Sequence, residues 1–479
     1  MKAVQQALYA EFGSRLAEKE AQRQEAERKQ RLRGRRAAGE RVESLLDPGS
    51  FTEIGSQLRH RSTAPGLADR HPPGDAVVTG HGTVDGRPVC CFAQDFTVFG
   101  GSLGEAVGEK IIRLMDLAAD SGAPVVGIND SAGGRIQEGP VAQSLYGQIF
   151  ARNVRMSGAV PQISVITGPC AGGAAYSPAL TDFVIMVDGL SHMFVTGPEA
   201  THQSIGEVVS LDDLGSARMH SSRAGTAHYL AADEQDAFAY TRALIGYLPH
   251  RGERLPGLLP PPPGSIAEGS DPGRHLPSGT RAAYDVRDVL ADLLDDRGYL
   301  EIHARYAPSV TVGFGRLGGA AVGVVATQPM VDGGALTAAA CDKAARFVRT
   351  CDAYGLPVVS LVDAPGGGSA GALDDVGRSG ARLLYAYTEA SVPMLTVTTR
   401  AAAGLAHLAL GSKHIGGDVH LAWPTALIDG RDVWAAAGDG TIDEVILPAE
   451  TRRRLHRALW LLRDKQRDRP PRKHGNLPL

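Results

Sequence analysis

The sequence GEKIIRLMDLAADSGAPVVGINDSAGG at residues 108–134 recurs in altered form as CDKAARFVRTCDAYGLPVVSLVDAPGG at residues 341–367. The two segments align without a gap at a spacing of 233 residues. Each has an amphipathic stretch of helical length, a Val-rich run typical of a buried strand and a Gly-rich turn. The repeat therefore predicts two related α/β domains in tandem, with right-handed β-α-β crossovers. Identical positions include Lys110/Lys343, Pro124/Pro357, Val125/Val358 and Asp130/Asp363.

A Pro-rich segment between the two repeats predicts the domain boundary. Residues 251–280 contain four consecutive prolines, which exclude a helix or a central strand. Near the N-terminus, residues 14–46 are rich in Ala, Glu, Arg and Gln and predict one long, largely solvated helix that ends at Asp47-Pro48-Gly49. The predicted organisation is a helical segment at 1–48, an N-terminal domain at 49–250, a linker at 251–280 and a C-terminal domain at 281–479.

Composition and charge exclude several classes of protein. A formal net charge of −4 over 479 residues provides no basic field for a nucleic acid or an anionic membrane. The N-terminus lacks a signal-peptide pattern, and no apolar run reaches the length of a membrane-spanning helix. The five cysteines show no metal-ligand spacing and predict reduced thiols. We therefore expect a cytoplasmic protein without a metal ion, a nucleic-acid partner or a membrane partner.

A second pair of related segments places small residues where a strand runs into a helix. Residues 167–174 read TGPCAGGA, and residues 399–406 read TRAAAGLA at almost the same spacing. The first N–H groups of a helix have no intrahelical acceptor and favour negative charge. Gly172 and Gly173 would leave these donors accessible, as in an oxyanion hole for a thioester enolate. Close packing of helix against strand is the alternative explanation for the same glycines.

Five longer motifs accompany these turns: NDSAGGRIQEG at 129–139, GPCAGGAAYSPALTD at 168–182, FVTGP at 194–198, KAARF at 343–347 and RKHGN at 472–476. With them the chain resembles the carboxyltransferase (β) subunit of biotin-dependent acyl-CoA carboxylases of the propionyl-CoA type. The resemblance covers nearly the whole chain. It implies two crotonase-like (ClpP/crotonase) carboxyltransferase domains in tandem, usually in a ring of six chains. It also implies that the N-terminal domain holds acyl-CoA and that biotin enters from the C-terminal domain.

The resemblance further implies roles for individual residues. Gly172 and Gly173 match the family's first oxyanion hole fully and would hold the thioester oxygen as the enolate forms. Leu405, Ala406 and His407 fall on the second hole, where biotin reacts. The other candidates would bind the substrate on the CoA side of the pocket: Phe99, Gly100, Gly101, Ala132, Gly133, Gly134, Arg135 and Tyr176.

Three departures from the family pattern lie near the second hole. The turn after Asp363 lacks the family's apolar wall and rigid proline. Leu405 carries a branched side chain where the family has glycine, so we expect it to obstruct the biotin carbonyl. The family's Gly-rich helix after Thr425 is missing, because residues 429–433 lead almost directly to Gly440. These changes predict an intact enolate hole and a damaged biotin site.

Loss of a carboxylate as CO2 needs only the enolate hole and a proton source. The leading hypothesis is therefore a decarboxylase that uses neither biotin nor another cofactor. Its substrate would be a malonyl-type thioester on CoA or a carrier, or a free β-keto (polyketide) acid. His407 is the candidate proton donor, and a structural hydrogen-bonding role is the alternative for it.

Two further hypotheses remain open. The first is a biotin-dependent acyl-CoA carboxyltransferase subunit, which receives biotin on a separate carrier protein and works with a biotin carboxylase subunit. The second is a non-catalytic scaffold subunit of a carboxylase complex. The resemblance implies a homo-oligomer, expected to be a hexamer, under each hypothesis.

Overall fold

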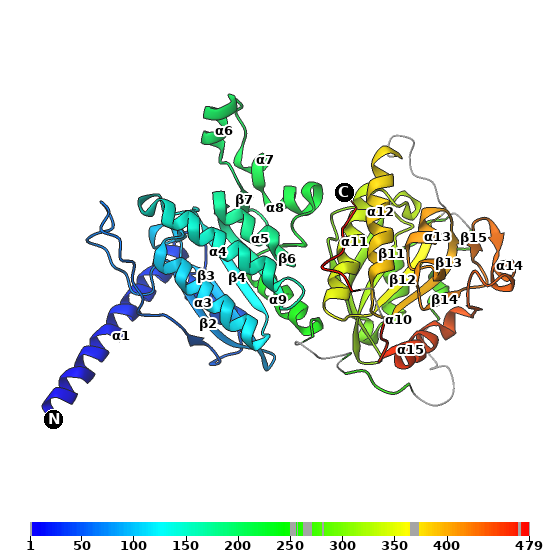
Figure 1. Ribbon diagram of the computed structural model, residues 1–479, viewed down its shortest axis with the longest axis horizontal. Coiled ribbons are helices and arrows are strands. Elements are labelled where there is room, and N and C mark those ends of the chain that lie inside the picture. The colour runs from blue at the N-terminus through cyan, green and yellow to red at the C-terminus, as the bar shows by residue number, and fades with distance from the viewer. Residues whose placement is uncertain are drawn as a thin grey trace. The chain divides into compact units, whose positions relative to one another are not determined.

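The computed structural model describes residues 2–249, 255, 257–261, 271–279, 282–364, 373–467 and 471–478. The chain forms two compact units, each with its own sheet and helices (Figure 1). The first unit comprises Met1–Ser221 and Thr226–Gly246, and the second comprises Ser222–Gly225 and Tyr247–Leu479. Much of the segment expected to be the linker, residues 251–280, lies outside the described residues.

The first unit is built on an eight-stranded sheet in the order β1-β2-β3-β4-β5-β6-β8, with β7 paired to β5. From β3 to β8 neighbouring strands run parallel, whereas β2 and β3 form an antiparallel hairpin. The strands are β1 Thr52–Glu53, β2 Val77–Val84, β3 Arg87–Gln94, β4 Val125–Ser131, β5 Gln162–Ala171, β6 Phe183–Val187, β7 His192–Phe194 and β8 Tyr229–Ala231. The α-helices are α1 Lys2–Arg31, α2 Ala38–Leu45, α3 Glu105–Ser121, α4 Pro140–Met156, α5 Tyr176–Leu180, α6 Pro198–Ile205, α7 Leu211–Gly215, α8 Ala217–Met219 and α9 Glu234–Tyr247.

The second unit repeats this plan on a nine-stranded sheet in the order β16-β15-β13-β12-β11-β10-β9, with β14 between β13 and β17. The strands are β9 Tyr299–Ile302, β10 Val310–Leu317, β11 Ala320–Thr327, β12 Val358–Ala364, β13 Met394–Ala402, β14 Val419–Ala422, β15 Leu427–Ile428, β16 Arg431–Asp432 and β17 Glu444–Val445. The α-helices are α10 Val286–Leu293, α11 Ala338–Ala353, α12 Leu373–Glu389, α13 Leu405–Ala409, α14 Val433–Gly438 and α15 Thr451–Leu462.

Short helices with other hydrogen-bonding patterns connect these elements. The 3-10 helices are η1 Phe99–Gly101, η2 Ile136–Glu138, η3 Gly172–Ala175, η5 Pro272–His275, η6 Asp295–Arg297, η7 Asp332–Gly334, η8 Lys413–Ile415 and η9 Pro448–Glu450. A π-helix, η4, covers His220–Ala224.

The internal repeat of the sequence is also a repeat of the structure. β2, β3 and β4 begin 233 residues before β10, β11 and β12. The buried Lys110 on α3 donates from Nζ to the carbonyl of Val77, and the buried Lys343 on α11 donates likewise to the carbonyl of Val310. The predicted α/β fold with two related domains is confirmed. Only the end of the second repeat, after Ala364, lies outside the described residues.

The single helix expected over residues 14–46 is wrong, because two helices cover this segment. α1 ends before Gly34, whose φ of +67° is a left-handed conformation that glycine adopts without strain. α2 then packs into the first unit, where the guanidinium of its fully buried Arg41 meets Asp130 at 2.8 Å and Glu234 at 2.9 Å. The need to place this arginine among buried carboxylates explains why the chain turns.

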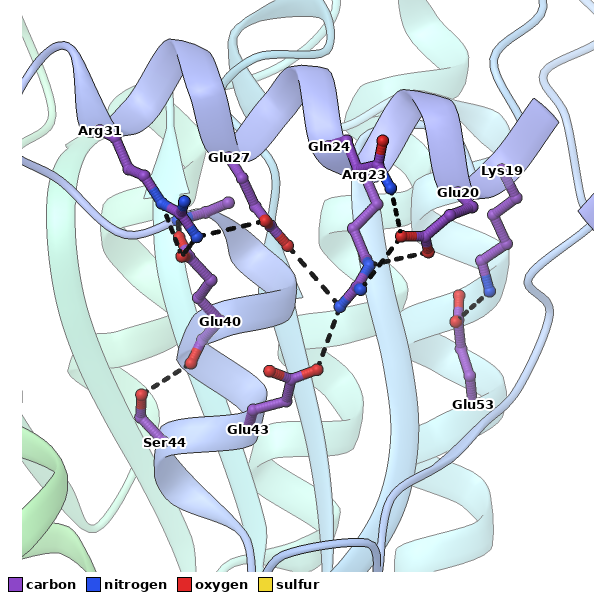
Figure 2. A network of polar contacts seen from close by, with 11 residues as sticks. Lys19, Glu20, Arg23, Gln24, Glu27, Arg31, Glu40, Glu43, Ser44 and Glu53 are labelled. Carbon is purple, nitrogen blue, oxygen red and sulfur yellow. Dashed lines mark hydrogen bonds and ion pairs between the residues drawn. The ribbon is translucent and has the colours of Figure 1, made fainter. Parts of the chain in front are cut away.

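Charged side chains connect α1 to α2 and β1 (Figure 2). Arg23 on α1 pairs with Glu43 on α2 at 3.2 Å, and Lys19 pairs with Glu53 of β1. Partly exposed ion pairs of this kind contribute at most about 1 kcal/mol each. They therefore orient α1 more than they stabilise the fold.

The cores of both units consist mainly of Ala, Val, Leu and Ile side chains, with Trp423 fully buried in the second. All five cysteines are buried and free. Within the described residues no helix is long and apolar enough to cross a membrane. The same part of the chain contains no group of three or more His, Cys, Asp or Glu residues arranged to hold a metal ion.

Candidate active site

The first predicted hole lies where β5 ends and η3 begins. Gly172 has a φ of +61°, and a Cβ atom there would approach only the carbonyl oxygen of Val195, at 4.0 Å. A Cβ atom on Gly173 would instead lie 3.0 Å from the ring of Tyr146 on α4. Gly172 thus faces open space, and Gly173 allows α4 to pack closely. Because the first N–H groups of a helix lack intrahelical acceptors, the N–H groups at this turn are candidate hydrogen-bond donors.

Cys170 lies two residues before this turn but does not fit a nucleophile. It is fully buried, and burial raises the pKa of its thiol to about 12. The thiolate, which is the nucleophilic form of cysteine, is therefore not populated at neutral pH.

The two segments predicted to line the CoA side lie against one another. The N–H of Ala132 donates to the carbonyl of Gly100 at 2.9 Å, and the N–H of Leu103 donates to the carbonyl of Gly133 at 2.9 Å. A Cβ atom on Gly101 would come within 2.1 Å of a backbone oxygen, so this close approach requires glycine. The structure therefore brings η1 and the turn after β4 together.

The predicted substrate residues differ in how accessible their side chains are. Ala132 and Tyr176 are exposed, as is the backbone at Gly134. Arg135 is buried, and its guanidinium binds both carboxylate oxygens of Asp75, at 2.8 and 2.9 Å. The ring of Phe99 covers the same guanidinium at 4.7 Å. The side chain of Arg135 holds the turn in place and is not free to bind a phosphate of CoA.

The second predicted hole lies where β13 leads into α13. Gly404 has a φ of +55°, and a Cβ atom there would meet no atom within 4 Å. It occupies the place that Gly172 has in the first unit. A cavity of about 460 Å³ lies beside the end of β13 and is lined in part by Arg400, Ala401 and Thr425, but Gly404, Leu405 and Ala406 do not line it. The backbone at Gly404 is itself exposed.

The side chain of Leu405, which was expected to obstruct this turn, contacts a neighbouring helix. A Cβ atom on Gly380 of α12 would lie 3.0 Å from Cδ2 of Leu405, so the leucine side chain packs against that helix. In the first unit the sizes of the two partners are reversed. The large side chain, Tyr146, lies on the helix α4, and the small residue, Gly173, lies on the turn. The large side chain of Leu405 on the turn is thus matched by a glycine on α12.

His407 does not fit a proton donor at the open face. Its side chain is buried on α13, and its ring centroid lies 6.1 Å from that of His420 and 6.3 Å from that of His414. Burial lowers the pKa of His407, and burial also lowers the pKa of His420 to about 3. Burial therefore favours the neutral imidazole in both rings, and a neutral imidazole is a much weaker acid than an imidazolium.

An aspartate at the end of the central strand in each unit is neutralised by a different arginine. Asp130 on β4 pairs with Arg41 from α2, whereas Asp363 on β12 pairs with Arg400 from the neighbouring strand at 2.7 Å. The sequence repeat aligns the two aspartates but shows neither arginine, because the partners come from unrelated positions. The sequence likewise contains no sign that Tyr146 packs over Gly173. The position 233 residues after Tyr146 is Ser379, so the repeat does not reveal this contact.

Leu405→Gly should therefore destabilise the second unit by about 2 kcal/mol without opening a site. The cost comes from lost packing on α12 together with the low helix propensity of glycine. Leu408→Gly is the matched control, because Leu408 lies on the same short helix with 44% of its surface exposed. Urea unfolding measures both variants. Equal losses of stability would show that Leu405 makes no contact of its own.

Comparison with known proteins identifies the family of the chain. The model of the family described as "Carboxyl transferase domain" matches residues 29–429. A propionyl-CoA carboxylase beta chain of Saccharopolyspora erythraea is 49% identical, over 93% of this chain and 91% of the relative. A biotin-dependent acetyl-/propionyl-coenzyme A carboxylase beta5 subunit of Mycobacterium tuberculosis is 46% identical, over 93% and 90%. A methylmalonyl-CoA decarboxylase subunit alpha of Veillonella parvula is 43% identical, over 93% and 94%.

A solved structure agrees with these relatives. The transcarboxylase 12S structure, described as a hexamer assembly with methylmalonyl-coenzyme A and methylmalonic acid bound, superposes with a TM-score of 0.91. It is 39% identical in sequence, and the match covers 97% of this chain and 98% of that one. The crotonase-like fold implied by the resemblance is therefore confirmed.

The expectation of a reaction without a cofactor is wrong, because a relative of nearly full length is biotin-dependent by name. The hypothesis of cofactor-free chemistry drew on three departures near the second turn. Of these, Leu405 packs its side chain against Gly380 of α12, and the turn at 365–372 lies outside the described residues. With the family match over most of its length and relatives at up to 49% identity, the chain belongs to the carboxyl transferase family.

Proposed function

We propose that this chain is the carboxyltransferase subunit of a biotin-dependent acyl-CoA carboxylase, with propionyl-CoA as its substrate. The observation that carries the proposal is the 49% identity to a propionyl-CoA carboxylase beta chain over 93% of this chain. The open faces at Gly172 and Gly404 support it. The reaction involves two carbonyl groups, one of the thioester and one of biotin, and each needs its own hydrogen-bond donors. In this proposal each of the two predicted domains, 49–250 and 281–479, supplies one of these sites.

The first turn would stabilise the enolate that forms from the acyl group. Removing a proton next to the thioester carbonyl places negative charge on the carbonyl oxygen. Backbone donors of Gly172 and Gly173 would hold that oxygen, and donors fixed in advance stabilise charge that develops during the reaction. The turns at 99–101 and 132–134 would lie along the CoA portion of the substrate.

The second turn fits biotin delivered on a separate carrier protein. Gly404 leaves its face open, and Leu405 turns its side chain toward α12. The N–H groups of Leu405 and Ala406 would hold the carbonyl oxygen of the biotin ring. Biotin supplies the carboxyl group, which it carries on a ring nitrogen next to that carbonyl. The role of the chain is to orient this carbonyl by two backbone donors, without a side-chain acid.

We also propose that the chain assembles into a hexamer, as the transcarboxylase 12S structure is described. A biotin carboxylase subunit and a biotin carrier are the expected protein partners. Light scattering of the purified chain at micromolar concentration should give six times the mass of one chain, and a monomer with full activity would contradict this assembly.

Transfer of a labelled carboxyl group tests the activity directly. The purified chain is mixed with a biotin carrier protein that bears a ¹⁴C-carboxyl group and with propionyl-CoA, and acid-stable label in methylmalonyl-CoA is counted. We expect label only when carrier, chain and acyl-CoA are all present. Absence of label with propionyl-CoA, acetyl-CoA and butyryl-CoA would contradict the proposal.

A second candidate function is the same transfer run in the opposite direction, as part of a decarboxylase. The 43% identity to a methylmalonyl-CoA decarboxylase subunit alpha favours it. In that case the chain would transfer the carboxyl group from methylmalonyl-CoA to the biotin carrier. The exchange of label from ¹⁴C-methylmalonyl-CoA into the carrier, compared with the forward rate, separates the two directions.

A further inference from the structure

The second turn carries a side-chain contact on its opening N–H group. The N–H of Gly404 donates to Oδ1 of Asp429 at 2.7 Å. Asp429 follows β15, which pairs with the last residues of β13. Its own N–H donates to the carbonyl of Ala402 at 2.9 Å. One residue therefore binds the chain on both sides of the turn, at Ala402 before it and at Gly404 after it.

This contact is held in an unusual backbone conformation. Asp429 has a φ of +48° and Gly404 a φ of +55°, both in the left-handed region. Aspartate tolerates this region better than most residues but still adopts it at a cost. Two hydrogen bonds, one to a charged acceptor, offset that cost. The conformation persists because the carboxylate and the turn constrain one another.

The first unit provides an internal comparison. There β7 pairs with the end of β5, as β15 pairs with the end of β13, with Met193 opposite Cys170 and Ile428 opposite Ala402, its counterpart in the second unit. The residue after Met193 is Phe194, whose aromatic side chain is partly buried. The chain thus places a carboxylate beside the second turn and an aromatic side chain at the same place beside the first.

We propose that Asp429 is a positioning residue for the second turn, one that fixes Gly404 so that the N–H groups of Leu405 and Ala406 stay directed at the biotin carbonyl. This inference rests on the proposed function. Asp429 lies in the turn of the hairpin formed by β15 and β16, so this hairpin carries the carboxylate that binds Gly404.

The variants Asp429→Ala and Asp429→Asn distinguish the effect of losing the hydrogen bond from the effect of losing the negative charge. Alanine removes the acceptor, and asparagine retains an acceptor oxygen of similar geometry. Misplacement of reacting groups is costly, so we expect alanine to lower kcat for carboxyl transfer by about tenfold or more. The KM for acyl-CoA should stay within about twofold, because acyl-CoA binds at the first turn in this proposal. Asparagine should restore kcat to within about threefold of the wild type.

Asp432→Ala is the matched control. Asp432 is also exposed and also caps backbone N–H groups, those of Trp434 and Ala435, both at 3.0 Å, but it does not contact Gly404. Loss of a cap alone should lower the stability of both alanine variants by similar amounts. Only Asp429→Ala should lower kcat. Equal kcat in the two alanine variants, or a loss that asparagine does not reverse, would overturn the inference.

Hydrogen exchange gives a readout that does not depend on turnover. Peptides covering residues 403–409 should exchange faster in Asp429→Ala than in Asp432→Ala, because the turn has lost its anchor. If wild-type protein transfers no carboxyl group while this difference in exchange is present, the proposed function fails and the anchor at Gly404 stands. Unchanged exchange in Asp429→Ala contradicts the positioning role whatever the activity.

Discussion

Replacing Gly173 by valine is expected to lower the rate of carboxyl transfer by about 100-fold or more, the scale of losing one donor of an oxyanion hole. Even a Cβ atom at this position would lie 3.0 Å from the ring of Tyr146, and valine adds two more carbon atoms. Either α4 or the turn must move, and movement of the turn displaces the N–H donors. The rate is measured with the labelled carrier, after circular dichroism has shown that the variant folds.

Two further variants identify the cause of the loss. Gly147→Val adds the same side chain to α4 one residue from Tyr146, where a Cβ atom meets nothing within 4 Å, and should leave the rate nearly unchanged. Tyr146→Ala combined with Gly173→Val removes the clash and should recover part of the rate. A Gly173→Val protein that folds and turns over like the wild type would assign the glycine to packing alone.

Replacing Arg41 by methionine is expected to lower the free energy of unfolding by about 3–5 kcal/mol. The guanidinium is fully buried between Asp130 and Glu234, so methionine leaves two carboxylates without their cation in a dry environment. Unfolding in urea, followed by far-UV circular dichroism, measures the effect.

Arg31→Met is the control for this substitution. Arg31 pairs with Glu40, but 67% of its side chain is exposed, and such pairs contribute about 0–1 kcal/mol. A loss of stability in Arg41→Met no larger than that in Arg31→Met would show that the buried pairs are not what fixes α2.

The sequence predicted the architecture because an internal repeat is visible without any structure. Strands such as β4 and β12 are buried along their whole length, so their residues are constrained to be small or β-branched in both copies. The Gly-rich turns repeat for a related reason, since Gly172 and Gly404 adopt positive φ values that other residues avoid. Both the strand pattern and the glycine pattern involve residues that are close together in the sequence.

The errors arose where contacts distant in sequence decide the outcome. Where the side chain of Leu405 packs depends on Gly380, which lies on another helix. The pattern around Leu405 alone does not reveal this contact. The break between α1 and α2 has a similar origin, because Arg41 must reach carboxylates from β4 and α9.

The first hypothesis about the reaction was wrong in its cofactor because it gave more weight to changes near the second turn than to the resemblance along nearly the whole chain. A backbone N–H remains whatever residue carries it, provided that the turn keeps its shape and its face stays open. Asp429, beside the shortened segment, supplies an anchor that the sequence pattern did not reveal.

Release of CO2 from methylmalonyl-CoA tests the central claim most directly. The purified chain is incubated with [¹⁴C-carboxyl]-methylmalonyl-CoA, with and without a biotin carrier protein, and both released CO2 and label on the carrier are counted. We predict that label leaves methylmalonyl-CoA only when the carrier is present, and that it appears first on the carrier. Release of CO2 at the same rate without carrier or free biotin would contradict the account and establish a biotin-independent decarboxylase.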